Sequence, residues 1–399
     1  MAMPNPTQET QPGLAILTNC ITPYRVHLHQ LIAAGIPELK LHTLISHGAA
    51  DFDWAIEVPP AIRLTNLGSP GDSPLRSPWS APLTEWRKGG RIVRYLEENN
   101  VQALIILTPR YISYLRVVAH CRWAGIPLFV RSDANLRSEN PLSPLKQFLK
   151  FRVYAWWLKR SRGVMPMGEY GKQYFEKYGF DRSRMYLVPY TPDYDFYASV
   201  DPRQVDRLRE KYRLSRARKY FVFSGRLVPV KRVDLLIDAF VQLAGERPDW
   251  DLILVGDGPL RQELEQRVPE ALRRRVVWTG FLDQGEPALV YHLADVLVLP
   301  SDREPWALVV QEAMSAGLTV VASDVVGAAQ EIVQDGRSGR IFPVGDGRAL
   351  GQAMLDVSHP DRLDGYKQQS REALSAWRQE VDPIAEIRRA LFTEGVLAS

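Results

Sequence analysis

The stretch "YFVFSGRLVPVKRVDLLIDAFVQLAG", residues 220–245, contains the pattern that decides the fold class. It begins with a short aromatic and β-branched run, passes through a turn with glycine, proline and basic residues, and ends in a longer segment whose apolar residues recur every three to four positions. The first pattern is typical of a strand buried on both faces, and the last is typical of a helix that packs on a sheet. Because another apolar run, "DLILV" at 251–255, follows, the stretch predicts a strand–helix–strand unit with parallel strands.

The same alternation extends over the rest of the chain. Further strand candidates in the second half are "RVVWTGF" at 275–281, "DVLVLPS" at 295–301 and "LTVVASD" at 318–324. The first half repeats the theme with "LAILTN", "LKLHTLIS", "ALIILTP", "IPLFVRSD" and "GVMPMG". With 399 residues, the chain exceeds the size at which one hydrophobic core usually divides. The pattern therefore predicts an α/β protein of two Rossmann-like domains.

The composition is that of a globular protein without a membrane span. Hydrophobic residues make up 45% and charged residues 24%, close to the average for soluble domains. No apolar run approaches the roughly 20 residues that cross a bilayer, and "MAMPNPTQETQPG" at the N-terminus lacks the features of a signal peptide. We therefore expect a cytoplasmic protein, in which Cys20 and Cys121 form neither a disulfide framework nor a zinc site. The net charge of +4 is too small to indicate nucleic-acid binding, but it is compatible with anionic substrates or an anionic membrane surface.

Residues that follow the predicted strands are the candidates for ligand binding, because open α/β sheets bind ligands at the carboxyl ends of their strands. Gly225 and Arg226 follow the run at 220–223, and Lys231 precedes the next helix. Glycine permits close approach of the backbone, while arginine and lysine supply donors and positive charge. Taken alone, such a pair of cations is more often solvated, but its place at a strand end favours an anion site that suits a diphosphate.

"REPWALVVQE", residues 303–312, places two carboxylates eight positions apart in an apolar segment. If the whole segment were helical, Glu304 and Glu312 would lie about 80° apart around the axis. Since proline suits the first turn of a helix, we expect the helix to begin at Pro305, with Glu304 before it and Glu312 two turns inside. For an arbitrary pair of this spacing, the simpler interpretation is one capping acid and one surface acid.

Four segments together resemble the family-4 retaining glycosyltransferases. They are "SGRLVPVKRVDLLIDAF" at 224–240, "VGDGPLRQEL" at 255–264, "ADVLVLPSDREPWALVVQEAMSAGLTVVASDVVGAAQEIV" at 294–333 and "DGRSGRIFP" at 335–343. In the first half the likeness is confined to the strand and helix pattern and "TPYRVHLHQL" at 22–31. The resemblance implies the fold called GT-B, in which two Rossmann-like domains face each other across a cleft and the C-terminal helix crosses back to the N-terminal domain. We accordingly expect an N-terminal acceptor-binding domain at 1–195 plus the returning helix at 375–399, and a C-terminal nucleotide-sugar-binding domain at 196–374.

The resemblance also implies roles for individual residues. Glu304 would face the donor sugar and Glu312 the ribose hydroxyls, while Arg226 and Lys231 would neutralise the diphosphate leaving group. The implied donor-binding set is completed by Gly225, Gly256, Gly258, Leu282, Pro305, Trp306, Ala307 and Leu308. The reaction would retain the anomeric configuration and would need neither a metal nor a cofactor, because the two cations take the place of a metal. "DYD" at 193–195 resembles a metal-binding motif, but its position between the domains favours a turn.

Three departures from the family pattern matter for the site. Ala307 replaces a frequent glycine, and a methyl group can be tolerated there if φ stays negative. In place of a histidine that faces the donor sugar, "FVRSDAN" at 129–135 offers Asp133 as the candidate catalytic residue. In place of a glycine-rich loop after the first strand, "NCITPYRVH" at 19–27 offers Tyr24, Arg25 and His27 as acceptor-binding candidates. His27 has the alternative of a structural role on its helix.

Two other functions remain as alternatives. A dinucleotide dehydrogenase is disfavoured, because the G-x-G in "VGDGP" lacks a third glycine at the right spacing. A non-catalytic protein that binds sugar nucleotides is disfavoured by the joint presence of Arg226, Lys231, Glu304 and Glu312. The donor is expected to be a nucleotide sugar and the acceptor a saccharide or a lipid-linked molecule, in the synthesis of a cell-surface polysaccharide or glycoconjugate.

The segment "KQFLKFRVYAWWLKRSR", residues 146–162, combines six cations with five aromatic residues and no acid. We expect the aromatic residues to pack on the sheet of their own domain, as in a crossover helix, and the cations to extend either into water or onto an anionic membrane surface. The proline-rich stretch "GSPGDSPLRSPWSAP" at 68–82 suits neither a helix nor a strand, so it predicts a long loop that is either functional or disordered.

Overall fold

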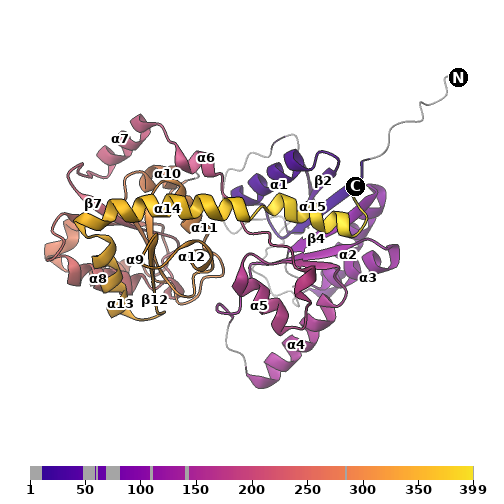
Figure 1. Ribbon diagram of the computed structural model, residues 1–399. Coiled ribbons are helices and arrows are strands. Elements are labelled where there is room, and N and C mark those ends of the chain that lie inside the picture. The colour runs from indigo at the N-terminus through magenta and orange to yellow at the C-terminus, as the bar shows by residue number, and fades with distance from the viewer. Residues whose placement is uncertain are drawn as a thin grey trace.

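The computed structural model describes residues 11–47, 59, 62–68, 81–107, 111–139, 143–283 and 285–398. In Figure 1 these residues form two domains side by side, the N-terminal one on the right and the C-terminal one on the left. Each domain contains a parallel sheet covered by helices, so the predicted fold class, two Rossmann-like domains in the GT-B arrangement, is confirmed. Most of the proline-rich loop predicted at 68–82 lies outside the described residues.

The sheet of the N-terminal domain has the strand order β3-β2-β1-β4-β5-β6, with every pair parallel. Its strands are β1 (Gly13–Thr18), β2 (Lys40–Ile45), β3 (Arg63–Asn66), β4 (Val101–Leu107), β5 (Leu128–Arg131) and β6 (Gly163–Met165). Its helices are α1 (Pro23–Gly35), α2 (Pro82–Glu98), α3 (Ile112–Ala124), α4 (Pro144–Leu158) and α5 (Glu169–Lys177), with a 3-10 turn η1 at Arg182–Arg184. Side chains alternate along β1, so that Leu14 and Ile16 join one core and Ala15 and Leu17 join the core on the opposite face.

The sheet of the C-terminal domain has the order β12-β11-β10-β7-β8-β9, again all parallel. Its strands are β7 (Lys219–Ser224), β8 (Trp250–Val255), β9 (Val276–Gly280), β10 (Val296–Leu299), β11 (Thr319–Ser323) and β12 (Gly339–Phe342). Its helices are α6 (Tyr194–Ala198), α7 (Pro202–Lys211), α8 (Val233–Leu243), α9 (Arg261–Arg267), α10 (Glu286–Tyr291), α11 (Leu308–Ser315), α12 (Gly327–Ile332) and α13 (Gly347–Val357). Two 3-10 turns, η2 (Pro229–Lys231) and η3 (Glu270–Arg275), complete the domain.

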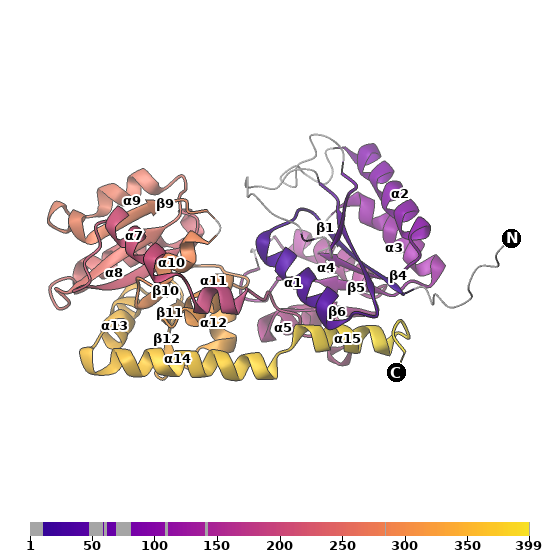
Figure 2. The same cartoon turned by 90° about the horizontal axis from the view of Figure 1, so that it is seen from above.

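The last two helices cross from the C-terminal domain to the N-terminal domain. Figure 2 shows α14 (Pro360–Glu380) along the C-terminal domain and α15 (Pro383–Thr393) continuing onto the N-terminal domain. Trp377, near the end of α14, still packs in the C-terminal core, whereas Ile387 of α15 packs in the N-terminal core. The carboxylate of Asp382 caps the first turn of α15. The chain therefore passes between the domains at Val381–Asp382, a few residues later than the expected 375.

α4 contradicts the expectation that its aromatic residues pack on the sheet. Trp157 is buried and Tyr154 partly buried, but Phe148 is 60% exposed, Phe151 40% and Trp156 41%. α4 lies at the lower edge of the N-terminal domain in Figure 1, beside α5. Phe151 and Tyr154 stack on Tyr178 at the end of α5, so the helix is attached through aromatic contacts and leaves much of its apolar surface uncovered. Among the described helices, none is long and apolar enough to span a bilayer.

Candidate active site

The carboxyl ends of both sheets face the region between the domains, and the residues predicted from the strand ends gather there. From the N-terminal domain, the loop after β5 carries Asp133 and Asn135. From the C-terminal domain, the loop after β10 carries Glu304 and Pro305. The Nδ2 of Asn135 donates a hydrogen bond to the carbonyl of Pro305 at 2.7 Å. Asp133 and Pro305 both line a small interdomain pocket, so the structure brings these two loops together.

Lys231 and Glu304 form an ion pair at the centre of this region. Lys231 ends the 3-10 turn η2, and Glu304 lies 73 positions later, after β10. Both side chains are largely buried, and the hydroxyl of Ser301 donates to the same carboxylate at 3.5 Å. A partly desolvated ion pair is stable only because both partners are present, since either one alone would be a buried charge. The structure thus brings these two predicted residues into direct contact.

Arg226 lies on the same loop as Lys231, and its side chain is exposed. No ion pair or hydrogen bond of its side chain with another described residue is found, so its guanidinium is available to an external anion. Gly225 precedes it, and a Cβ at Gly225 would lie 4.0 Å from the Cε of Lys231. The tighter neighbour of that Cβ would be Cζ of Phe223, at 3.3 Å. The structure places Arg226 and Lys231 on the same loop, as predicted for an anion site.

Gly256 and Gly258 follow β8, and the structure gives them a packing role. A Cβ at Gly256, whose φ is +121°, would lie 2.0 Å from the carbonyl oxygen of Gly225. A Cβ at Gly258 would lie 2.4 Å from the carbonyl oxygen of Leu227. Both glycines therefore allow the loop after β8 to pack directly on the loop that carries Arg226. Leu282, also predicted for the donor, is buried just after β9.

The helix of the E-x7-E segment begins at Leu308, which corrects the prediction that it begins at Pro305. Ala307 has φ +72° and ψ +75°, so the condition of a negative φ is not met and its methyl group is accommodated in the left-handed region. The reason is that Pro305 and Trp306 form a turn against α12. The amide N–H of Gly327 donates to the carbonyl of Glu304, and that of Ala328 donates to the carbonyl of Trp306. The chain must then reverse at residue 307 before α11 starts, so Glu312 lies in the second turn of the helix.

We expect Ala307→Gly to leave the free energy of unfolding unchanged or raise it by up to about 1 kcal/mol. The left-handed conformation costs an L-residue roughly 1–2 kcal/mol, which glycine avoids, although glycine gains more entropy on unfolding. Ala307→Val should instead lower the free energy of unfolding by about 2 kcal/mol, because a β-branched residue fits this conformation poorly. Urea unfolding measures both changes. Ala349→Gly, inside helix α13, is the matched control and should lower the free energy of unfolding by about 0.5–1 kcal/mol. A similar loss in Ala307→Gly would contradict the view that the backbone at Ala307 is strained.

A buried network that the sequence did not reveal holds the turn at Trp306 in place. The indole N–H of Trp306 donates to Oε1 of Gln311 at 2.8 Å, and Nε2 of Gln311 donates to the hydroxyl of Tyr194 at 2.7 Å. The ring of Trp306 also packs near that of Trp377 on α14, and Arg378 lies over the ring of Tyr194. The loop with Glu304 is thereby connected to the segments that join the two domains. A single glutamine on an apolar helix face gives no signal of this kind.

Glu312 is buried beside two tyrosines. The hydroxyl of Tyr291 donates to its Oε2 at 3.3 Å, and Tyr197 also hydrogen-bonds to the carboxylate. Burial raises the pKa of Glu312 to about 7, and the two phenols lower it by less than burial raises it. The carboxylate is therefore held in a place where an additional hydroxyl donor would favour its charged form.

The N-terminal side of the region contains a cavity of about 190 Å³ at the carboxyl ends of β1, β4, β5 and β6. Its lining includes two predicted residues, Arg25 and Asp133, and an unpredicted one, Arg131. Tyr24 lies beside the cavity, with its ring edge-on to that of Tyr190 at 4.7 Å. His27 does not line this cavity and lies near Asp193 and Asp195. Burial lowers the pKa of His27, and the charges of the two aspartates offset only part of this effect. The structure therefore places His27 at the junction between the domains.

Asp193 has the turn-forming role that the sequence suggested. Its carboxylate accepts a hydrogen bond from the amide of Phe196 and so caps α6. Among the residues that the structure describes, no group of three or more His, Cys, Asp or Glu side chains is arranged to hold a metal ion.

Comparison with known proteins places these features in a family context. Residues 204–373 match the family model described as glycosyl transferases group 1. The chain is 32% identical over 213 residues to 2-deoxystreptamine glucosyltransferase of Streptomyces kanamyceticus, covering 52% of this chain and 55% of that protein. It is 30% identical over 299 residues to D-inositol 3-phosphate glycosyltransferase of Mycolicibacterium smegmatis, covering 71% of this chain and 63% of that protein. The chain spans less than two thirds of the length of the curated relatives it matches.

Among solved structures, the Anabaena protein HepE in complex with UDP and glucose aligns with a TM-score of 0.71. The alignment covers 97% of this chain and 100% of HepE at 18% sequence identity. A likeness at this level of identity concerns the fold, and it extends over both domains.

Proposed function

We propose that this chain, which belongs to the glycosyl transferases group 1 family through residues 204–373, transfers a sugar from a nucleotide-diphosphate sugar to a saccharide or lipid-linked acceptor. The observation that carries the proposal is the ion pair of Lys231 with Glu304, next to the free guanidinium of Arg226. Two cations at a strand end suit a diphosphate, and a carboxylate beside them suits sugar hydroxyls. The similarity to 2-deoxystreptamine glucosyltransferase and to D-inositol 3-phosphate glycosyltransferase supports the same activity.

The proposed chemistry assigns Arg226 and Lys231 to the leaving group. As the glycosidic bond breaks, negative charge develops on the nucleoside diphosphate, and cations already in place stabilise that charge without reorganisation. Glu304 would accept hydrogen bonds from hydroxyls of the donor sugar, and Asp133 would approach the same sugar from the N-terminal domain. Since the cations supply the charge neutralisation that a metal gives elsewhere, we propose transfer without a metal or cofactor and with retention of the anomeric configuration. Addition of EDTA should then leave the rate unchanged.

The test is to incubate the purified chain with a panel of nucleotide-diphosphate sugars and saccharide acceptors. We expect release of the nucleoside diphosphate from at least one donor, together with a glycosylated product whose anomeric configuration, determined by NMR, equals that of the donor. Thermal-shift screening of the same nucleotides identifies the donor base in parallel. If a nucleotide raised the Tm but neither hydrolysis nor transfer occurred with any donor, the chain would be a non-catalytic sugar-nucleotide-binding protein, the alternative function.

We predict that nucleotide binding depends on the protonation of Glu312. Hydroxyls of the donor ribose favour the charged carboxylate, so binding should release the proton that Glu312, with a pKa of about 7, holds at lower pH. Affinity for the nucleoside diphosphate should therefore rise about tenfold from pH 6 to pH 8. Isothermal titration calorimetry at the two pH values measures this affinity. Glu312→Gln should bind about ten- to a hundredfold more weakly, as expected for a lost hydrogen bond to a charged group.

The same variant is the control for titration of the phosphate itself, because any pH dependence that remains in Glu312→Gln belongs to the nucleotide. An equal pH dependence in both proteins would contradict a ribose contact by Glu312. The raised pKa has a second consequence: the stability that protonated Glu312 contributes is fully present below its unfolded-state pKa and is lost as the pH rises through about 7.

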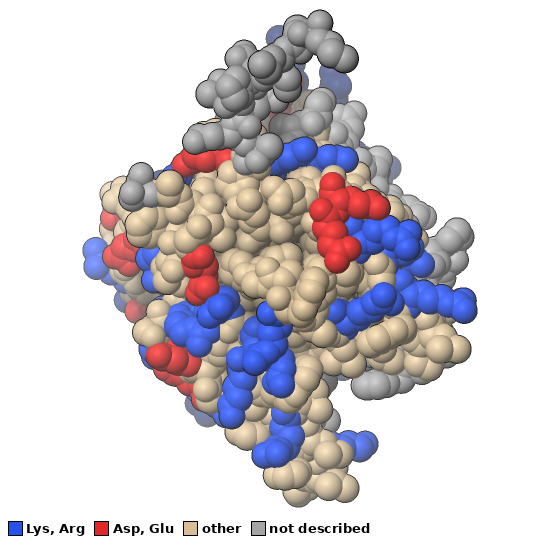
Figure 3. All heavy atoms as spheres, turned by 90° about the vertical axis from the view of Figure 1, so that its right-hand side faces the viewer, with Lys and Arg blue, Asp and Glu red and all other residues tan. Residues whose placement is uncertain are grey.

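We also propose that α4 binds an anionic membrane surface, which would bring the enzyme to a lipid-linked acceptor. Leu145, Phe148, Leu149 and Val153 are each more than half exposed on this helix. In Figure 3, the lobe at the lower edge, where Figure 1 places α4, shows Lys and Arg among uncharged residues and no Asp or Glu. Cations beside exposed apolar groups are the combination that lies on an anionic bilayer, where each basic residue contributes about 1 kcal/mol.

The structure identifies which cations are available for this contact. Lys150 pairs with Glu139, and Arg162 pairs with Glu394. Lys146, Arg152 and Lys159 are exposed and form no ion pair or hydrogen bond with another described side chain. Lys150 and Arg162 are therefore engaged within the protein. Lys146, Arg152 and Lys159 are the residues to substitute.

Co-sedimentation with vesicles tests the proposal. We expect binding to vesicles with anionic lipid at low salt, weaker binding at high salt, and no binding to neutral vesicles. Substituting Lys146, Arg152 and Lys159 with Gln should weaken binding about a hundredfold. A variant with Arg207, Arg273 and Arg274 as Gln, which removes the same charge from the C-terminal domain, is the matched control and should bind like the wild type. Equal binding of both variants would contradict a role for α4.

A further inference from the structure

Two arginines, the buried Arg131 and the partly buried Arg25, line the cavity of the N-terminal domain. Arg25 comes from the first turns of α1 and Arg131 from the last residue of β5, so they approach the cavity from different elements. The cavity lies at the carboxyl end of the sheet, where parallel α/β sheets bind ligands. Among the described residues, Asp133 is the only acidic side chain in its lining. The walls thus carry an excess of positive charge.

Arg131 is 4% exposed and is oriented by the main chain. Its Nε donates to the carbonyl of Val188 at 3.1 Å, and its Nη2 donates to the carbonyl of Pro189 at 3.2 Å. Its guanidinium also lies over the ring of Tyr190, 4.8 Å from the centroid. These contacts hold the group rigidly but neutralise none of its charge. These two hydrogen bonds use two of its five N–H donors.

Arg25 is held in a similar way on the opposite wall. Its Nη1 donates to Oγ1 of Thr18 at 2.8 Å, to Oδ1 of Asn19 at 2.9 Å and to the carbonyl of Cys20 at 2.6 Å. All three acceptors are uncharged. Its Nε is buried and has no hydrogen-bond partner among the described residues. A donor of this kind, buried and unsatisfied, normally costs stability unless a ligand accepts from it.

Neither guanidinium forms an ion pair with a carboxylate of the described residues. The interaction with Asp133 is long-range and acts on Arg131. The resulting field also acts on the neighbouring His29, whose pKa is lowered to about 3 by burial and by the charges of Arg131 and Arg25. Burying two positive charges without a counter-charge is unfavourable in a structure that has nothing to gain from them. An external anion would supply the missing charge.

We propose that Arg25 and Arg131 form a subsite for a phosphate or carboxylate group of the acceptor, so that the enzyme glycosylates an anionic acceptor. The inference rests on the proposed function, which it deepens by naming the chemical class of the acceptor. A guanidinium binds either anion through two parallel hydrogen bonds, and the cavity of about 190 Å³ has room for such a group. Asp133, in the same lining, also lines the interdomain pocket with Pro305. An anion held by the arginines would therefore place the rest of the acceptor next to the donor side.

Binding of inorganic phosphate is the first test, measured as the shift in Tm at constant ionic strength with sodium chloride as the reference. We expect phosphate to raise the Tm of the wild type, both without UDP or GDP and with a saturating concentration of whichever nucleotide binds. Arg25→Met should weaken phosphate binding at least tenfold, whereas Arg226→Met, in the C-terminal domain, should leave the binding seen at saturating nucleotide unchanged. Arg131→Met, which also removes two hydrogen bonds to the main chain, is compared only if its circular dichroism matches that of the wild type. Loss of phosphate binding in the presence of nucleotide would assign the anion to the donor's diphosphate and overturn the proposal.

A paired acceptor panel is the second test, in which each polyol or sugar is assayed beside its phosphate monoester and lipid-linked phosphates beside soluble ones. We expect kcat/KM to be at least tenfold higher for the anionic member of the accepted pair, and Arg25→Met to bring this ratio close to one. Equal use of neutral and anionic members by the wild type would overturn the anionic subsite and leave the proposed function standing. Arg25-dependent phosphate binding without release of nucleotide from any donor would support the site and overturn the proposed function.

Discussion

Replacing Lys231 by Ala is expected to lower kcat for glycosyl transfer about a hundredfold or more while the fold is retained. A charged contact that strengthens as the leaving group departs typically contributes on the order of 3 kcal/mol to the transition state, which corresponds to about two orders of magnitude in rate. Lys231 lies on a 3-10 turn and does not belong to the hydrophobic core of its domain. Glu304→Gln should cause a comparable loss, because it removes the charge that pairs with Lys231 and that, in the proposed function, accepts hydrogen bonds from sugar hydroxyls.

The experiment measures kcat and KM for the accepted donor in both variants, with circular dichroism as the check of folding. Arg303→Ala is the matched control, since Arg303 is the exposed neighbour of Glu304 and has no assigned contact; its kcat should stay within about twofold of the wild type. A further comparison comes from the double variant with Lys231→Ala and Glu304→Gln. Its loss should be less than the product of the two single losses, because the residues act as a coupled pair. Either single variant retaining more than half of the wild-type kcat would refute its assigned role.

The sequence predicted the central strands and two of the four edge strands, β6 and β9, but missed the other two edge strands. The ten predicted strands correspond to β1, β2, β4, β5, β6 and β7 to β11. The missed strands, β3 ("RLTN") and β12 ("GRIF"), are four residues long and lie at the edges of the two sheets. A strand with one partner has one side in contact with solvent, so it need not form a continuous apolar run. The periodicity that identifies a central strand is therefore weak at an edge.

The candidate site shows the same division between local and distant signals. Arg226, Lys231 and Glu304 could be predicted, because the strand-end rule and the family resemblance depend on neighbouring residues in the sequence. Asn135 and Gln311 could not be predicted, because each acts through a contact that is distant in the sequence. Asn135 donates to Pro305, 170 positions away, and Gln311 donates to Tyr194, 117 positions away. The unusual φ of Ala307 is likewise imposed by the packing of the preceding turn on α12. The sequence thus nominates candidate residues for the site, while tertiary contacts determine how they are held.

The aromatic residues of α4 illustrate why burial is difficult to predict from periodicity. Phe148 and Trp157 lie in the same helix and have similar sequence surroundings, but only Trp157 reaches the core. The helix is attached mainly at its C-terminal end, because the loop that follows leads directly into β6. Apolar residues in the preceding turns are carried beyond the sheet and remain exposed. Periodicity indicates which side chains share a face, but not how far the face is covered.

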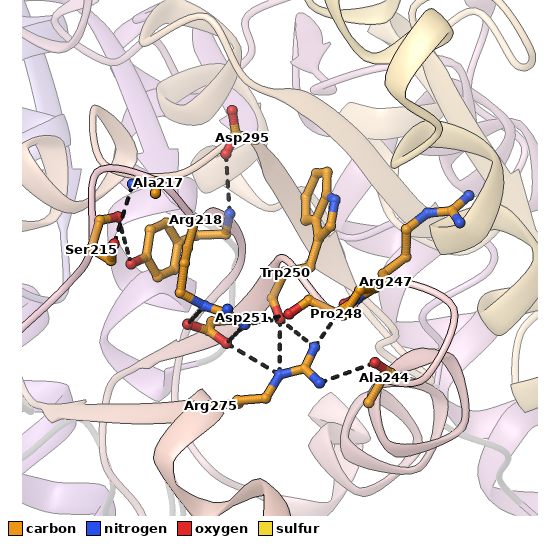
Figure 4. A network of polar contacts seen from close by, with 11 residues as sticks. Ser215, Ala217, Arg218, Ala244, Arg247, Pro248, Trp250, Asp251, Arg275 and Asp295 are labelled. Carbon is orange, nitrogen blue, oxygen red and sulfur yellow. Dashed lines mark hydrogen bonds and ion pairs between the residues drawn. The ribbon is translucent and has the colours of Figure 1, made fainter.

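A polar network at the opposite end of the C-terminal sheet provides the second large expected effect. Figure 4 shows Arg218 and Arg275 converging on Asp251 at the amino ends of β7, β8 and β9. Nη2 of Arg218 donates to Oδ1 of Asp251 at 2.6 Å, and Nε of Arg275 donates to the same oxygen at 3.3 Å. Arg275 also donates to the carbonyls of Ala244 and Arg247, so one carboxylate joins the sheet to the end of α8. The network is far along the strands from the carboxyl ends that carry the site.

Asp251→Ala is expected to lower the free energy of unfolding by about 3 kcal/mol and the Tm by roughly 6–12 °C. Removing the carboxylate leaves two guanidiniums without their counter-charge, which costs 3–5 kcal/mol at fully buried sites, and the partial exposure of Arg218 and Arg275 reduces the loss toward the lower limit. Asp238→Ala is the matched control, because its pairing with Arg267 is exposed on both sides and should contribute less than about 1 kcal/mol. Urea unfolding measures both variants, and kcat per folded molecule should equal that of the wild type in each. Equal losses in the two variants would show that the network at Asp251 is no stronger than a surface ion pair, whereas a lower kcat in folded Asp251→Ala would show that the amino ends of the strands communicate with the site.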